Sequence, residues 1–75
     1  MDSRQEEIII KDFGKRLKKF RLQRGLSLRA LADVADMNHG NIHEIEVGRV
    51  NPSVSTVILL ARAMNISPRE LLPET

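Results

Sequence analysis

The sequence predicts an all-α domain, a five-helix bundle. Apolar residues recur at steps of three and four through most of the chain, which is the period of an amphipathic helix. Cap residues, glycines and prolines divide this pattern into short segments, and no strand alternation or internal repeat is visible. Seventy-five residues form one domain at most, with a modest core. We expect a frayed segment over residues 1–7 and one helical domain over residues 8–75.

The first helix is expected to begin near Ile8. Its apolar face is made by Ile10, Phe13, Leu17 and Phe20. Gly25 follows Arg24 and is a natural stop, because glycine readily adopts the left-handed conformation that ends helices. Gly14 lies inside the helix at a cost of about 1 kcal/mol relative to alanine. We expect it to allow a close approach of another backbone.

The second and third helices are expected to lie very close in sequence. Ser27 is a good N-cap for the second, since its hydroxyl can accept a free backbone N–H. The second helix has its apolar stripe at Leu28, Leu31, Ala32 and Ala35. Asn38 caps a third helix that runs to about Val47, with Ile42 and Ile45 facing inward. Only residues 35–37 remain between them, and so short a turn forces the steep crossing of a helix-turn-helix unit.

Two further helices complete the expected bundle. Asn51-Pro52-Ser53 is a turn that runs into a cap, followed by a fourth helix. The inner face of this helix is expected to consist of Val54, Val57, Leu60, Ala61 and Met64. Ser67 and Glu70 have the spacing of a capping box with proline at the first helical position, which predicts a fifth helix over residues 68–72.

Charge is distributed unevenly along the chain. The formal net charge is only +2, but residues 11–29 hold eight basic side chains against one acidic side chain, Asp12. Such a segment indicates a polyanionic partner, although a solvated basic helix face would have the same composition. The chain has two phenylalanines and no other aromatic residue, which argues against a stacking platform for single-stranded nucleic acid.

Several classes of function lack support in the sequence. Without cysteine there is no disulfide or thiolate metal site, which fits a cytoplasmic protein. No apolar run is long enough to span a bilayer and no signal peptide is visible, so we expect no membrane association. His39 and His43 share a helix edge but lack further metal ligands. Ser27, Ser53 and Ser67 are explained as caps, and no catalytic constellation is seen, so we expect neither enzyme activity nor a cofactor.

An ordered set of motifs gives the chain its resemblance to a known family. The motifs are GKRLKKFRLQRGLS at residues 14–27, Leu31-Ala32, Ile42-x-x-Ile45-Glu46-x-Gly48-Arg49, Asn51-Pro52-Ser53, Leu60-Ala61-x-Ala63-Met64 and Glu70-Leu71-Leu72. Together they resemble the phage-repressor/Cro family, also called Xre-like, over roughly residues 13–72. The resemblance implies five helices, of which the second and third form the unit that binds double-stranded DNA.

The resemblance also implies which residues read bases. Carried over, they are His39, Gly40 and Glu44 at the start of the third helix, with Asn41 and His43 nearby. If Ile42 and Ile45 face inward, a rotation of about 100° per residue points Gly40, His43, Glu44 and Val47 most directly outward. Glu44 could accept a hydrogen bond from a cytosine amino group; otherwise it would repel wrong sites or pair with a neighbouring residue on the base-reading face of its own chain. The histidines could donate to bases or phosphates, or be ordinary surface residues, and Gly40 could allow close approach or be a variable surface position.

Phosphate contacts are expected on both sides of the third helix. Arg49 and Asn51 follow it, and the N–H groups at the Ser27 end of the second helix form an anion site favoured by the helix dipole. Many family members have glutamine where this chain has Leu28, so the contact there falls to the backbone near Ser27 or to Arg29. The expected recognition helix also lacks glutamine, arginine and lysine, which leaves the target sequence open.

Two structural features complete the expectation. The resemblance implies an ion pair between Arg21 and Glu46 that links the first helix to the end of the third. An apolar surplus at Ile58, Leu59, Leu71 and Leu72 favours a symmetric homodimer, although a monomer can also tolerate scattered surface aliphatics. Such a dimer would set two recognition helices about 34 Å apart on a pseudo-palindrome.

The function expected from all of this is a sequence-specific DNA-binding transcriptional regulator, either a repressor or a restriction–modification controller. The alternative is a protein-interaction module, such as an antitoxin or a co-regulator. Salt distinguishes the two, because binding through several phosphates weakens steeply as the salt concentration rises. No small-molecule effector is evident.

Overall fold

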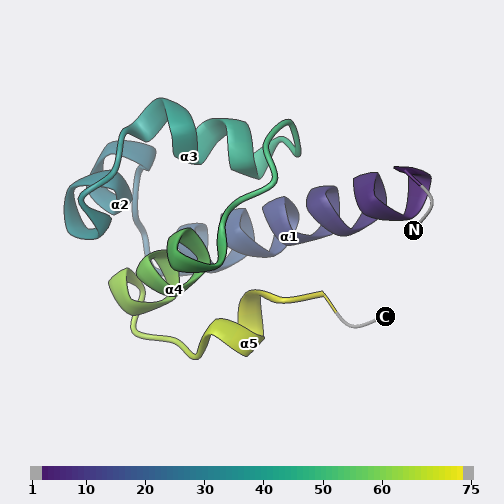
Figure 1. The fold of residues 1–75 in the computed structure, drawn as a ribbon. Coiled ribbons are helices and arrows are strands. Elements are labelled where there is room, and N and C mark those ends of the chain that lie inside the picture. Colours follow the sequence, from purple (N-terminus) through teal and green to yellow (C-terminus); the bar gives the residue numbers. More distant parts are fainter. Residues whose placement is uncertain (1–2, 74–75) are drawn as a thin grey trace.

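The computed structural model describes residues 3–73 and confirms the all-α, five-helix prediction (Figure 1). The elements are α1 (Ser3–Gln23), α2 (Leu28–Ala35), α3 (His39–Glu46), α4 (Val54–Ala63) and α5 (Pro68–Leu71). Within residues 3–73 there is no strand. None of the helices in this part of the chain combines the length and the apolar character needed to cross a membrane.

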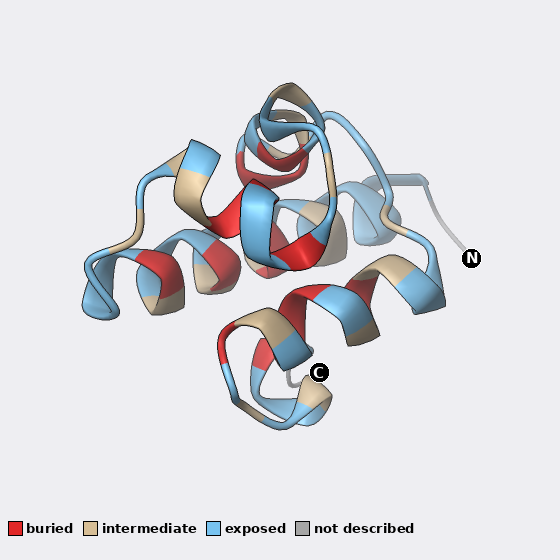
Figure 2. Cartoon of the chain, turned by 90° about the vertical axis from the view of Figure 1, so that its left-hand side faces the viewer, coloured by how far each residue is buried: buried red, intermediate tan, exposed pale blue. Residues whose placement is uncertain are grey.

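The long helix α1 packs mainly against two of the other helices, α3 and α5. In Figure 1, α3 lies above α1 and α5 below it, and both helices contact α1. Helix α2 packs against α3 and α4, and α4 packs against α5. Figure 2 shows the buried stretches of the helices turned toward one another in the middle of the molecule. The largest side chains with no exposure are Leu17, Leu31, Ile42, Leu60 and Leu71.

Three helices begin at side-chain caps that the sequence predicts. Ser27 Oγ accepts a hydrogen bond from the Ala30 N–H (3.0 Å), and Ser53 Oγ accepts one from the Thr56 N–H (3.2 Å). Asn38 Oδ1 accepts one from the Gly40 N–H (2.7 Å). Each bond satisfies one N–H that the first turn of a helix leaves free. The caps therefore fix where α2, α3 and α4 start.

The connection between α2 and α3 is as short as expected, spanning residues 36–38. Asp36 ends α2 with φ +55°, in the left-handed region. The N–H of Met37 then donates to the Ala32 carbonyl (2.9 Å), which closes the helix end. Aspartate is one of the few residues besides glycine that adopts this conformation readily. The reversal at Asp36 is what turns the chain directly from α2 into α3.

Helix α1 begins five residues before the predicted start near Ile8. Residues 3–7 of the segment expected to be frayed are helical and exposed, and Met1 and Asp2 lie outside the described residues. The apolar pattern gave no sign of these first turns because none of their side chains reaches the core. Glu6 in the first turn favours the helix by complementing its dipole.

Four details near the fourth and fifth helices differ from the prediction. Val54 is 77% exposed rather than part of the inner face, because it is the first residue of α4 and burial begins only at Val57. Ser67 makes no side-chain cap bond, and α5 ends one residue early, at Leu71. Leu71 has no exposure at all, so its assignment to a dimer interface was wrong. The core of the single chain, not a second copy, covers that side chain.

Candidate nucleic-acid interface

The outer face of α3 carries the residues predicted to read bases. His39, Asn41 and His43 are exposed, and Gly40 and Glu44 are half-buried. The inner face of the same helix is Ile42, Ile45 and Glu46, all buried. The helix therefore presents polar side chains on the side away from the core. At Gly40 this face has no side chain.

A buried ion pair fixes the end of α3 against α1. Arg21 Nε donates to Glu46 Oε2 (2.6 Å) and Arg21 Nη2 donates to Glu46 Oε1 (3.0 Å), the two-bond geometry in which guanidinium and carboxylate match best. Arg21 Nη1 also donates to the Leu26 carbonyl (2.8 Å). The hydrogen bonds that Arg21 donates to the Glu46 carboxylate raise the pKa of Arg21; burial lowers this pKa, and the negative charge of Glu46 raises it further. This is the pair that the family resemblance implied.

Gly14 brings the same two helices into close contact. A Cβ atom at this position would lie 2.5 Å from the Glu46 carbonyl oxygen and against the Ile45 carbonyl oxygen, both backbone atoms. No side chain fits between α1 and α3 there, as the sequence indicated. Gly14 and Arg21 thus hold the last residues of α3 against α1. These contacts set the orientation of the outer face of α3 relative to α1.

A second ion pair lies on the outer side of α3. Arg49 Nη1 donates to Glu44 Oε2 (3.2 Å), and the side chains are 69% and 39% exposed. The Arg49 N–H also donates to the Glu44 carbonyl (3.0 Å). Of the roles open for Glu44, the structure contains the pairing within its own chain. The partner, Arg49, is a residue for which the sequence predicted a phosphate contact. The base-reading candidate Glu44 and the phosphate candidate Arg49 are therefore in direct contact.

The other phosphate candidates flank α3. The Ser27 hydroxyl already accepts from the Ala30 N–H as a cap, which leaves the remaining N–H groups of the first turn of α2 for an anion. Arg29 is exposed, and it lines an open hollow between α2 and α3 together with His39. On the other side of α3, Asn51 and Asn41 line a second hollow. Each hollow therefore joins one base-reading candidate to one phosphate candidate.

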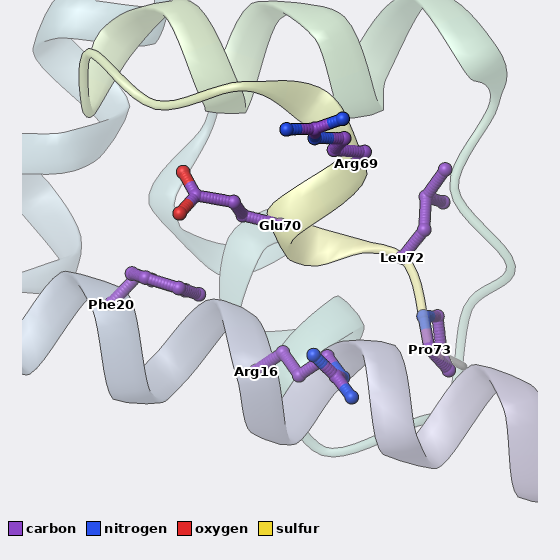
Figure 3. A pocket seen from close by; sticks show the side chains of 6 residues that line it. All are labelled: Arg16, Phe20, Arg69, Glu70, Leu72 and Pro73. Carbon is purple, nitrogen blue, oxygen red and sulfur yellow. The ribbon is translucent and has the colours of Figure 1, made fainter.

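The basic segment of residues 11–29 does not form a single surface. Arg21 is buried, and Arg24 donates to the Met64 carbonyl (2.7 Å) while lying 5.6 Å from the centre of the Phe20 ring. Arg16 faces a hollow between α1 and α5, across from Arg69 and Glu70 (Figure 3). Several of the charges that indicated a polyanion partner are thus structural or lie away from α3, which sequence counting could not distinguish.

Metal ligands do not gather in the described part of the chain. Residues 3–73 contain no group of three or more histidine, aspartate and glutamate side chains placed to hold a metal ion. Glu46, the acidic residue nearest in sequence to His43 after Glu44, is committed to Arg21.

Comparison with known proteins identifies the class to which this fold and surface belong. A family model described as helix-turn-helix matches residues 17–71, and the chain belongs to that family. The restriction-modification controller protein C.AhdI from Aeromonas hydrophila is similar in structure, with a TM-score of 0.82 and 35% identity over 84% of this chain and 96% of that one. The clp gene regulator ClgR from Corynebacterium glutamicum has a TM-score of 0.80 and 27% identity, over 84% and 82% of the two chains.

A curated relative is much longer than this chain. The HTH-type transcriptional regulator PuuR of Escherichia coli K12 is 38% identical over 61 residues, which are 81% of this chain and 33% of PuuR. The chain spans about a third of that relative's length, so the similarity concerns the helix-turn-helix part alone.

Proposed function

We propose that this chain is the DNA-binding part of a transcriptional regulator, a repressor or a restriction–modification controller, and that it acts in the cytoplasm. The observation that carries the proposal is the outer face of α3, which is polar, exposed or half-buried, and joined to α1 by the Arg21–Glu46 pair. A helix presented in this way fits the major groove of B-DNA. The names of C.AhdI, ClgR and PuuR as regulators favour the same function.

The proposed contacts divide into two groups. The base edges are met by residues of α3, namely His39, Gly40, Asn41, His43 and Glu44. The phosphates on either side are met by the α2 N-terminus at Ser27, by Arg29, and by Arg49 and Asn51. Phosphate contacts supply most of the affinity and set the register, while base contacts supply the sequence preference.

The test is selection of duplexes from a random pool, followed by a salt titration of the selected site. We expect a preferred sequence, and an affinity that falls with a slope of about −0.9 per phosphate contact on a plot of log K against log salt. Selection that returns no preferred sequence, or binding that does not respond to salt, would contradict the proposal. In that case a protein partner becomes the better interpretation.

We further propose that the working form is a homodimer. Leu59 is 44% exposed on the outer side of α4, next to the half-buried Ile58, and Leu72 is exposed just after α5. Helices α4 and α5 pack against each other, and these side chains lie on α4 or directly after α5. Pairing these side chains about a two-fold axis would bury them and place two α3 helices on the half-sites of a pseudo-palindrome.

Sedimentation equilibrium of the chain at tens of micromolar tests the dimer. Leu59→Glu should shift the chain to monomers and weaken binding to a two-half-site duplex. Leu22→Glu is the matched control, since Leu22 is 57% exposed on α1. This variant should sediment with the same dimer mass as the parent. A monomeric parent, or a Leu59→Glu variant that still dimerises, would remove this face from the proposal.

A further inference from the structure

The ion pair between Glu44 and Arg49 joins a base-reading position to a phosphate-binding position. Neither a base contact of Glu44 nor a phosphate contact of Arg49 requires the two side chains to pair with each other. We infer that the pair is a specificity switch. In the free protein Glu44 holds Arg49, and DNA that offers a cytosine amino group to Glu44 favours the release of Arg49 to a phosphate. This inference rests on the proposed function and names the base that the surface selects, a cytosine.

The geometry makes the pair exchangeable. One hydrogen bond of 3.2 Å joins the two side chains, and the guanidinium is 69% exposed. Exposed pairs of this kind shift an equilibrium by about fivefold or less, because water screens them. A DNA phosphate that reaches the Arg49 guanidinium is therefore a strong competitor for it.

Only the Arg49 side chain needs to move. Its N–H is fixed on the Glu44 carbonyl (3.0 Å), and Gly48 forms the turn before it with φ +80°. A Cβ atom on Gly48 would lie 3.1 Å from the Lys11 Cα, so this turn also packs against α1. The backbone of residue 49 thus stays in place while the guanidinium swings from the carboxylate to a phosphate.

The carboxylate of Glu44 decides when this exchange is favourable. Once Arg49 leaves, a half-buried negative charge faces a groove lined by phosphates, which disfavours binding unless a donor replaces the guanidinium. In the major groove the N4 amino group of cytosine donates to a carboxylate, whereas the N6 amino group of adenine lies beside the N7 acceptor, which repels a carboxylate. On other sequences the uncovered carboxylate opposes the exchange, so that Arg49 adds less to non-specific binding than to binding of the selected site.

The test is a double-mutant cycle on two duplexes of equal length, the selected site and a random sequence. Arg49→Ala should weaken the selected site by about tenfold and flatten its salt slope by about 0.9, yet weaken the random duplex by only about threefold or less, because the loss there is only that of an unpaired Glu44 charge. Glu44→Gln should raise the affinity for the random duplex by about threefold or more, because it frees Arg49 and removes a negative charge from the groove. In the Glu44→Gln background, Arg49→Ala should weaken both duplexes alike.

Two control variants on α1 make matching changes of charge, one from a basic residue to alanine and one from glutamate to glutamine. Lys19→Ala and Glu7→Gln alter exposed charges that the proposed surface does not use, and both should leave the ratio of the two affinities unchanged. Selection with the Glu44→Gln variant should also relax the preference for a C·G pair at one position of the site.

Two results would overturn the switch. One is Arg49→Ala weakening both duplexes by the same factor in the parent, which would make Arg49 an independent phosphate contact. The other is an unchanged base preference in Glu44→Gln. Failure of the DNA-binding function itself is a different result, namely a parent protein that selects no sequence and whose binding ignores salt.

Discussion

Two glutamates of α3, only two residues apart, pair with arginines in opposite environments. Glu46 meets Arg21 through two hydrogen bonds in the interior, whereas Glu44 meets Arg49 through one longer bond at the surface. The rotation of the helix places them on different sides, one toward α1 and one toward solvent. The same pair of chemical groups therefore serves the fold in one place and remains open to exchange in the other.

The physical reason for the difference is desolvation. A buried guanidinium and carboxylate have both lost their hydration, so each depends on the other, and removal of one leaves an uncompensated charge. An exposed pair has lost little, and water replaces either partner at small cost. The predictions below measure this contrast, starting with the change expected to be largest.

Glu46→Ala is expected to lower the free energy of unfolding by about 3–5 kcal/mol, since it strands Arg21 in the interior. For a domain of this size each 1 kcal/mol lowers Tm by about 4–8 °C. Thermal or urea unfolding measures the change, with Glu44→Ala as the matched control in the same helix. A Glu46→Ala variant that melts within a degree or two of the parent would show that the pair does not hold α3.

Replacing both partners sharpens that prediction. Arg21→Met combined with Glu46→Leu should recover a large part of the loss, because an apolar pair of similar size carries no desolvation penalty. Recovery should be incomplete, since the Leu26 carbonyl loses the hydrogen bond from Arg21 Nη1. A double variant no more stable than Glu46→Ala alone would argue against a stranded charge as the cause.

Gly14→Ala tests the close approach of α1 and α3 beside the buried pair. In an ordinary helix this change stabilises by about 1 kcal/mol. Here the new Cβ would meet the backbone of residues 45 and 46, which cannot yield without moving α3, and we expect a loss of about 1–3 kcal/mol instead. Gly40→Ala is the comparison, since the nearest atom there is the Asn38 side-chain oxygen at 3.0 Å. A stabilised Gly14→Ala variant would mean that the two helices separate easily.

Local chemistry explains what could be predicted from the sequence. Ser27, Asn38 and Ser53 cap their helices through atoms within three residues of themselves, so the pattern alone places the helix starts. The family resemblance added the Arg21–Glu46 pair, whose partners lie 25 residues apart. No periodicity argument links residues at that separation.

Features that depend on the assembled fold were missed or left open. Leu71 and Leu72 are neighbours of the same type, and only the placement of a four-residue helix decides that the first is buried and the second exposed. The Glu44–Arg49 pair was one of the alternatives for Glu44, and its geometry depends on the turn at Gly48. Composition could not show which arginines of the basic segment are structural either, because that depends on what each helix face meets.

The smallest expected effect is that of the surface pair on stability. Glu44→Ala should change the free energy of unfolding by less than about 1 kcal/mol, and 1 M salt should remove most of the difference from the parent, since salt screens exposed charges strongly. The deficit of Glu46→Ala should persist in the same salt, because its effect arises from burial. Urea unfolding at two salt concentrations measures both. If Glu44→Ala were as destabilising as Glu46→Ala, Arg49 would be held as firmly as Arg21, and a DNA phosphate could not draw it away from the carboxylate.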